Sequence, residues 1–287
     1  MAQSPSHKFG QIIGDLVEAM IHAPLKRVAR EHGLYLDYKH QRRARDNKRK
    51  VAWTDHRGNV HDLDYVFEKG GSETTIGSPK AFIESAWRRY TKHSRNKAQE
   101  IQGAIGPLAE TYSEHYPFLG VVLAGVFTDG SLQQLRSHGF SILYLPYETI
   151  CRAFAAVGID AAFDEETPDR ELQAKVNAWE ALPDNEKKKV ASVLKRSRKA
   201  ELDAFLSDLE TALDRTIEKI LIIALHGPRA EVASIDAAVA FVEGYSENKP
   251  AHGFVRYEIN VQYSNGDTIT GSFSDKRTAI EFLHGLH

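Results

Sequence analysis

Two acidic side chains stand in stretches that otherwise have the pattern of buried strands. Asp64 lies in HDLDYVFE (61–68) and Glu84 in AFIESAW (81–87). A carboxylate is costly to bury without a compensating partner, so each of them calls for an explanation. Carboxylates on neighbouring strands can hold Mg²⁺, which favours oxygen ligands, activates bound water and stabilises charge at phosphorus. Both residues are therefore candidates for holding a divalent cation, and Asp62 is a further candidate in the same strand.

The segment after Glu84, WRRYTKHSRNK (87–97), places cations between aromatic side chains. Lys97 falls early in a predicted helix, from which an amine could reach back to the end of the preceding strand. Cations in such a position can contact the phosphate oxygens of a nucleic acid. The alternative is a connector whose cations pair with nearby acids. The candidate phosphate-binding residues are Arg88, Arg89, Lys92 and Arg95.

The elements that must position these residues follow from hydrophobic periodicity. Apolar residues recur every three or four positions from Ile12 to Val28 and predict a first helix that ends near Gly33. The strand, helix and strand that follow Glu84 favour a parallel crossover. After the first helix we predict, in order, a strand at 34–38, a hairpin turning at 55–59 with its second arm at 60–68, a strand at 80–87, a helix from 94, an apolar strand at 118–127, a helix at 132–138 capped by Ser131, and a strand at 140–146.

The second half of the chain has a different pattern. An acidic, turn-rich stretch at 163–168 marks the best candidate for a domain boundary. Helical spacing follows, and the last part alternates strands and helices, with a hairpin turning at Asn265-Gly266. We therefore expect three parts: a core at 1–165, a helical region at 166–218 and a small α/β module at 219–287.

Composition narrows the functional classes. The chain has 287 residues, 42% of them hydrophobic and 26% charged, as expected of a globular protein. Cys151 is the only cysteine, which excludes a disulfide framework or a cysteine-based zinc site within one chain. The sequence lacks an apolar leader, a membrane-length apolar run and a phosphate-binding loop, so we expect a cytoplasmic protein with no membrane contact and no nucleotide cofactor.

Two basic runs stand out despite a formal net charge of −2. They are KHQRRARDNKRK (39–50) and KKKVASVLKRSRK (187–199). Lys and Arg side chains in such runs can displace the counterions of a nucleic acid. The alternative is a solvated loop or helix face, and the sequence leaves both interpretations open.

The order of the first 160 residues resembles the PD-(D/E)XK nuclease superfamily, the fold of restriction endonucleases. The resemblance implies an α/β fold with a mixed sheet flanked by helices, here followed by the helical region and the small module. Asp64 matches the metal-binding Asp of that family and Glu84 its second acid, with Mg²⁺ as the cofactor and Mn²⁺ as a substitute. The family's lysine, two positions after the second acid, is replaced here by Ala86. In some relatives the following helix supplies this lysine, which points to Lys97, with Lys92 as an alternative and Arg88 as a weaker substitute.

The same resemblance suggests three auxiliary residues and a function. Glu18 on the first helix, with Gln99 and Glu100 on the helix of Lys97, could supply a further ligand or phosphate contact, or could be ordinary solvated or helix-paired side chains. The implied activity is cleavage of double-stranded DNA by a homodimeric, type II-like restriction or other defence endonuclease. A non-catalytic DNA-binding subunit with the same fold and an RNA-directed nuclease are the alternatives.

Overall fold

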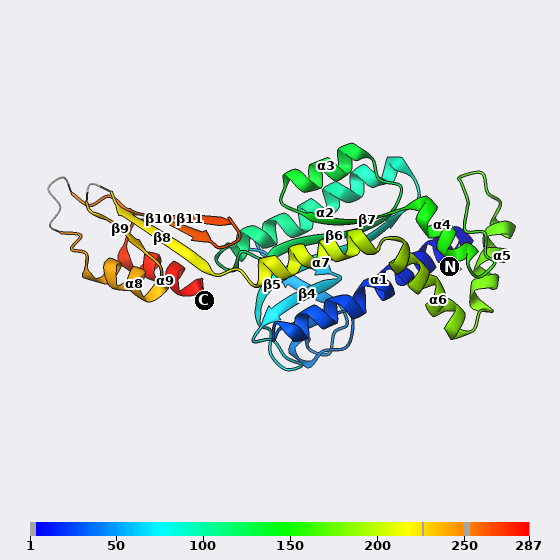
Figure 1. Cartoon of the computed structure of the whole chain (residues 1–287), viewed down its shortest axis with the longest axis horizontal. Helices are drawn as coiled ribbons and strands as arrows, with labels where there is room; N and C mark the ends of the chain where they lie inside the picture. Colours follow the sequence, from blue (N-terminus) through cyan, green and yellow to red (C-terminus); the bar gives the residue numbers. More distant parts are fainter. Residues whose placement is uncertain (1–3, 226, 249–252, 287) are drawn as a thin grey trace. The chain divides into compact units, whose positions relative to one another are not determined.

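The computed structural model describes residues 4–225, 227–248 and 253–286, without the side chain of Lys92. Its chain divides into two compact units, the first made of residues 1–111 and 118–210 and the second of 112–117 and 211–287. Figure 1 shows the elements of both units. No helix of the described residues is long and apolar enough to cross a membrane.

The first helix, α1 (Pro5–Glu31), confirms the prediction from periodicity. The hydroxyl oxygen of Ser4 accepts a hydrogen bond from the backbone N–H of His7, and Pro5 occupies the first helical position, where a missing N–H costs nothing. The helix stops before Gly33, which adopts a φ of +64° that other residues rarely take. Its apolar stripe is buried against the main sheet and later helices.

A five-stranded mixed sheet forms the centre of the first unit. Its first three strands are antiparallel neighbours, and its last three run parallel. The strand at 118–125 is buried over most of its length, as its continuous apolar run predicted, and it is an interior strand that lies next to the central one. In spatial order the strands are β1 (Tyr35–Tyr38), β4 (Tyr65–Lys69), β5 (Ser78–Arg88), β6 (Phe118–Gly125) and β7 (Ser141–Pro146).

Helices flank this sheet on both faces. The parallel crossovers are made by α2 (Thr91–Thr111), between β5 and β6, and by α3 (Asp129–Ser137), between β6 and β7. Figure 1 shows these two helices on one face and α1 on the other, where α4 (Tyr147–Ala155) also contacts β6 and β7. Thr128, and not the predicted Ser131, caps α3. The first unit is thus a mixed α/β fold with a helix-flanked sheet.

The predicted helical region at 166–218 is not a separate unit. Its helices α5 (Asp169–Glu180) and α6 (Asp184–Ser197) both contact α1, and α6 also contacts α4. In α7 (Lys199–Leu213), Phe205 packs edge-on against Phe118 of β6 with ring centroids 5.8 Å apart. These helices bury their apolar stripes against the first unit, so the division falls near residue 210 and not at 166.

The strand predicted at 60–68 is two strands in two sheets. β3 (Val60–Leu63) pairs with β2 (Val51–Thr54) in a separate two-stranded sheet, whereas β4 joins the main sheet. Asp64 lies at the break between them. The chain changes partner strands at this residue, which frees the Asp64 side chain from the alternation of a continuous strand.

The first basic run is partly structural. Arg42 is the residue just before the short 3-10 helix η1 (Arg43–Arg45), and its fully buried guanidinium donates two hydrogen bonds to Glu68, of 2.6 and 2.8 Å. It also pairs with Asp37 at 2.7 Å, and Arg45 binds the other oxygen of Asp37 at 2.8 Å. Two cations that the sequence offered for phosphate binding thus neutralise buried carboxylates.

The second unit has a four-stranded antiparallel sheet covered by two helices. The predicted hairpin is confirmed, with Gly266 at a φ of +88° in its turn, and β9 is a strand that the sequence did not predict. The short helix η2 (Ser113–His115) also belongs to this unit. In spatial order the strands are β11 (Thr268–Phe273), β10 (Tyr257–Tyr263), β8 (Ile217–Ala224) and β9 (Arg229–Val232), with α8 (Ile235–Gly244) and α9 (Lys276–Gly285) against them.

Candidate active site

Glu84 of β5 and Lys97 of α2 form an ion pair between the strand and the helix that follows it. The amine Nζ of Lys97 lies 3.3 Å from Oε1 of Glu84, and the two side chains are only 17% and 14% exposed. Glu84 stands on β5, and Lys97 stands in the second turn of the helix that follows. The position two residues after the acid holds the buried Ala86, so the amine beside Glu84 comes from α2.

Asp64 lies against the same part of β5. Tyr65 pairs with Ile83 across the sheet, which brings the preceding residue, Asp64, beside Glu84 and Ser85. Oδ2 of Asp64 accepts hydrogen bonds from the backbone N–H of Ser85 at 2.7 Å and from its hydroxyl at 3.0 Å. These bonds fix the carboxylate at the break between β3 and β4. Ser85 is a positioning residue that the sequence interpretation missed.

The surroundings of Glu84 disfavour the ionised form of its carboxyl group. Burial, and then the charge of Asp64, raise the pKa of Glu84 from 4.5 to about 7, although Lys97 acts in the opposite direction. The oxygen Oε2 of Glu84 is buried and has no hydrogen-bond partner within the described residues. A buried acceptor without a donor is costly, so this atom would gain from a proton or a cation.

Glu18 of α1 joins this group as a third acid. Burial, followed by the charges of Asp64 and Asp15, raises the pKa of Glu18 to about 7, while Lys39 lowers it. Tyr65 fixes the helix here, because its hydroxyl donates to the backbone carbonyl of Glu18 at 3.2 Å. Four elements, α1, the β3–β4 junction, β5 and α2, therefore converge on one acidic cluster. The sequence offered Glu18 only as an auxiliary residue, because helical spacing does not show which strand a helix flank will meet.

The remaining acids and amides lie at the edge of this cluster or outside it. Asp62, on β3, is exposed and pairs with Lys50, and it is not among the charges that shift the pKa of Glu84. Glu100 is 60% exposed and lies 3.8 Å from Lys97 on the same helix. Gln99 is exposed on α2. These positions agree with the simpler interpretation of solvated and helix-paired side chains.

The four cations proposed for phosphate binding differ in their surroundings. Arg89 is occupied by structural contacts: its Nε donates to the carbonyl of Phe163 at 2.6 Å, and its guanidinium lies 4.0 Å from the ring centre of Tyr147. Arg88 donates to the carbonyl of Trp87 and lies 3.7 Å from Glu100, at the edge of the acidic cluster. Arg95 is exposed on α2. Lys92 lies in the same helix, and its side chain is outside the described part of the chain.

A polar cavity of about 610 Å³ opens beside the cluster. Acidic side chains of α1 line one part of the cavity, and cationic side chains of α2, β5 and the loop after β1 line another. A phosphate group could therefore bind the cations, and its counterions could bind the acids. Its polar lining includes His7, Gln11, Asp15, Glu18, Lys39, Ser85, Arg88 and Lys97.

The side chains of the cluster could hold a metal ion that needs only two protein ligands, but not one that needs three or more. Within the described residues no group of three or more His, Cys, Asp or Glu side chains is arranged to hold a metal ion. Mg²⁺ commonly binds through one or two carboxylates and completes its octahedron with water and phosphate oxygens. Asp64 and Glu84 fit that mode, because the unpartnered Oε2 of Glu84 lies beside the charge of Asp64.

Comparisons with known proteins add little to this geometry. No protein-family model matches the chain, and no curated protein matches it. The crystal structure of AF1548, a protein of unknown function, aligns with 69% of this chain and 97% of its own, with 8% identity and a TM-score of 0.28. A similarity of this level supports no conclusion about fold or function.

Proposed function

We propose that this chain is a metal-dependent endonuclease of the PD-(D/E)XK type, which hydrolyses phosphodiester bonds in double-stranded DNA as a type II-like restriction or defence enzyme. The observation that supports the proposal most directly is the amine of Lys97 at 3.3 Å from Glu84, with Asp64 on the neighbouring strand. Two acids and one amine gathered beside one strand are groups that can carry out this hydrolysis. A homodimer would present one such site to each DNA strand.

The roles follow from the positions of the side chains. Asp64 and Glu84 would hold Mg²⁺ or Mn²⁺, which when bound lowers the pKa of water and stabilises charge on the phosphate. Ser85 keeps Asp64 oriented through its two hydrogen bonds. Lys97 holds its proton on Nζ, positions the attacking water and offsets the negative charge that develops on the phosphate oxygens. Glu18, with a pKa of about 7, can accept a proton from that water near neutral pH.

The second candidate function is DNA binding without cleavage. Two observations favour it: Ala86 replaces the strand lysine, and Lys97 is already engaged with Glu84. In that case the cluster would be a remnant of a nuclease site, and the chain would bind DNA with the salt dependence expected of phosphate contacts. An RNA-directed nuclease would use the same chemistry on a different substrate.

A cleavage assay with matched variants separates these functions. Purified protein is incubated with plasmid, linear DNA and RNA of the same sequence, with Mg²⁺, Mn²⁺ or EDTA. We expect metal-dependent cleavage of DNA by the wild type, and a loss on the order of 100-fold or more in Asp64→Asn and Glu84→Gln, the size typical for catalytic side chains. Asp62→Asn is the control, because it removes a carboxylate from the same hairpin without touching the cluster.

Three other results would change the conclusion. Salt-dependent DNA binding with no cleavage in either metal would support the non-catalytic subunit. Cleavage of RNA alone would support the third function. Cleavage that persists in both Asp64→Asn and Glu84→Gln would show that the acidic cluster is not the active site.

A further inference from the structure

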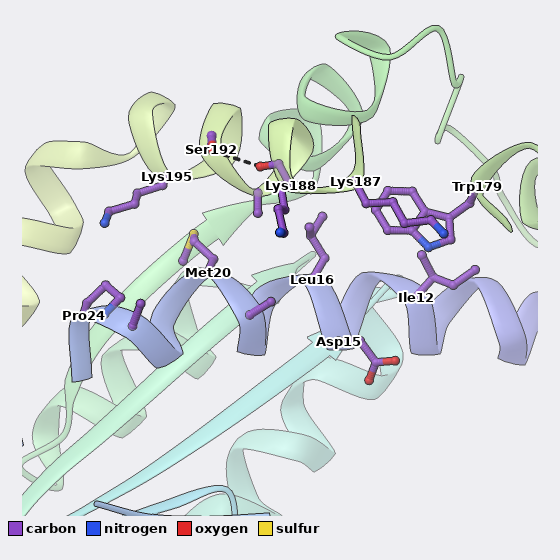
Figure 2. A pocket seen from close by; sticks show the side chains of 13 residues that line it. Ile12, Asp15, Leu16, Met20, Pro24, Trp179, Lys187, Lys188, Ser192 and Lys195 are labelled. Carbon is purple, nitrogen blue, oxygen red and sulfur yellow. Dashed lines mark hydrogen bonds between the residues drawn. The ribbon is translucent and has the colours of Figure 1, made fainter. Parts of the chain in front are cut away.

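A groove of about 630 Å³ lies between α1 and α6, outside the acidic cluster. Its floor is apolar, and Figure 2 shows side chains of α1 and α5 converging on it. The volume is within the range of about 300–1,000 Å³ found for binding pockets. The apolar lining residues larger than alanine are Ile12, Leu16, Met20 and Pro24 from α1 and Trp179 from α5.

The rim of this groove is cationic. Lys187, Lys188 and Lys195 of α6 line it, and none of them forms an ion pair with a carboxylate in the described part of the chain. Asp15 also lines the groove, but Figure 2 shows its carboxylate pointing away from the lysines. The second basic run of the sequence thus places unpaired positive charge along an apolar surface.

The spacing of these charges limits what can fill the groove. Lys188 and Lys195 are seven residues apart on one helix, which corresponds to about 10 Å along its axis. On the facing side of the groove, Leu16 and Met20 follow one another along α1, so the apolar side chains run alongside the lysines (Figure 2). A ligand with a single acidic head group would need the cations gathered at one end. Charges spread along the groove fit a partner that carries carboxylates along its length.

We propose that this groove binds an acidic amphipathic α-helix of a partner protein. Such a helix lays its apolar residues, spaced at i, i+3, i+4 and i+7, on the floor formed by α1. Its flanking Asp and Glu side chains face the lysines of α6, so charge complementarity fixes its orientation. The proposal is independent of the nuclease function, because none of the residues given a role in the hydrolysis lines the groove, and Asp15, which borders both the groove and the polar cavity, has no such role.

The test uses a labelled synthetic helix of roughly five turns with Leu at the apolar positions and Glu beside them. Fluorescence anisotropy measures its binding to the full chain, and the same peptide with Lys in place of Glu is the first control. We expect saturable binding of the Glu peptide, weakened about tenfold by Lys195→Glu, because attraction becomes repulsion. Arg196→Glu is the matched control: it is the next residue in the last turn of α6, undergoes the same charge change and does not line the groove.

A second variant tests the proposal by filling the groove with a larger side chain. Ala19 is exposed on α1 and lines the groove, so Ala19→Trp fills the space without disturbing the core, and we expect it to abolish binding. Circular dichroism establishes that each variant is folded. Equal binding of the Glu and Lys peptides, or binding unaffected by Ala19→Trp, would overturn the proposal. Self-association of the wild type that Ala19→Trp abolishes would assign the groove to a second copy and would also overturn it.

Discussion

Glu84 provides a direct test of the electrostatics of the acidic cluster. Without a metal, burial and the charge of Asp64 raise its pKa in the folded state from 4.5 to about 7. A carboxyl whose pKa is raised on folding stabilises the protein below its unfolded pKa, and this contribution is lost as pH rises through the folded value. Since one pKa unit corresponds to about 1.4 kcal/mol, ionised Glu84 lowers the free energy of unfolding by on the order of 3 kcal/mol at about pH 8.

Glu84→Gln replaces this acid with a neutral group of the same shape. It imitates the protonated form, so we expect the variant and the wild type to be similarly stable near pH 4.5, where Glu84 is largely neutral. Between about pH 4.5 and 7 the variant should become progressively more stable than the wild type, by up to roughly 3 kcal/mol. Glu18 titrates in both proteins, so its contribution cancels in the difference.

Urea unfolding followed by circular dichroism, at several pH values in EDTA, measures this difference. Asp62→Asn is the matched control, because its carboxylate is exposed and paired with Lys50. Added Mg²⁺ should stabilise the wild type above neutral pH and leave Glu84→Gln unchanged, because only the ionised carboxylate binds the ion. A difference between the two proteins that does not vary with pH would refute the interpretation of Glu84 as a strained buried anion.

Three further predictions concern single side chains. Lys97→Met should reduce DNA cleavage by on the order of 100-fold, whereas DNA binding, measured by filter retention, should change little. Equal losses of cleavage and binding would contradict a positioning role for Lys97. Glu18→Gln should flatten the rise of the cleavage rate with pH near neutrality, and an unchanged pH profile would exclude Glu18 as a proton acceptor. Arg42→Met should lower the free energy of unfolding by about 3–5 kcal/mol, because it leaves buried carboxylates without their cation. Arg43→Met, at an exposed neighbouring position, is its control and should change stability by less than about 0.5 kcal/mol in urea unfolding.

Features that depend on neighbouring residues were determined by the sequence alone. The stripe from Ile12 to Val28 specified α1, and the apolar run at 118–127 specified the buried interior strand β6, because periodicity and length distinguish these elements locally. Asn265-Gly266 specified the turn of the second unit's hairpin, because Gly266 readily adopts the positive φ that such turns require. The acids Asp64 and Glu84 were identifiable because a charge among apolar strand residues is unusual.

Only the tertiary structure decided which charges meet. Arg42 and Arg45 are as basic in sequence as their exposed neighbours, yet they are buried in ion pairs. Lys97 reaches Glu84, and Glu18 joins them, only because α2 and α1 pack against β5. The physical reason is that the energy of a charge depends on its burial and on partners far away in the chain, neither of which local spacing contains.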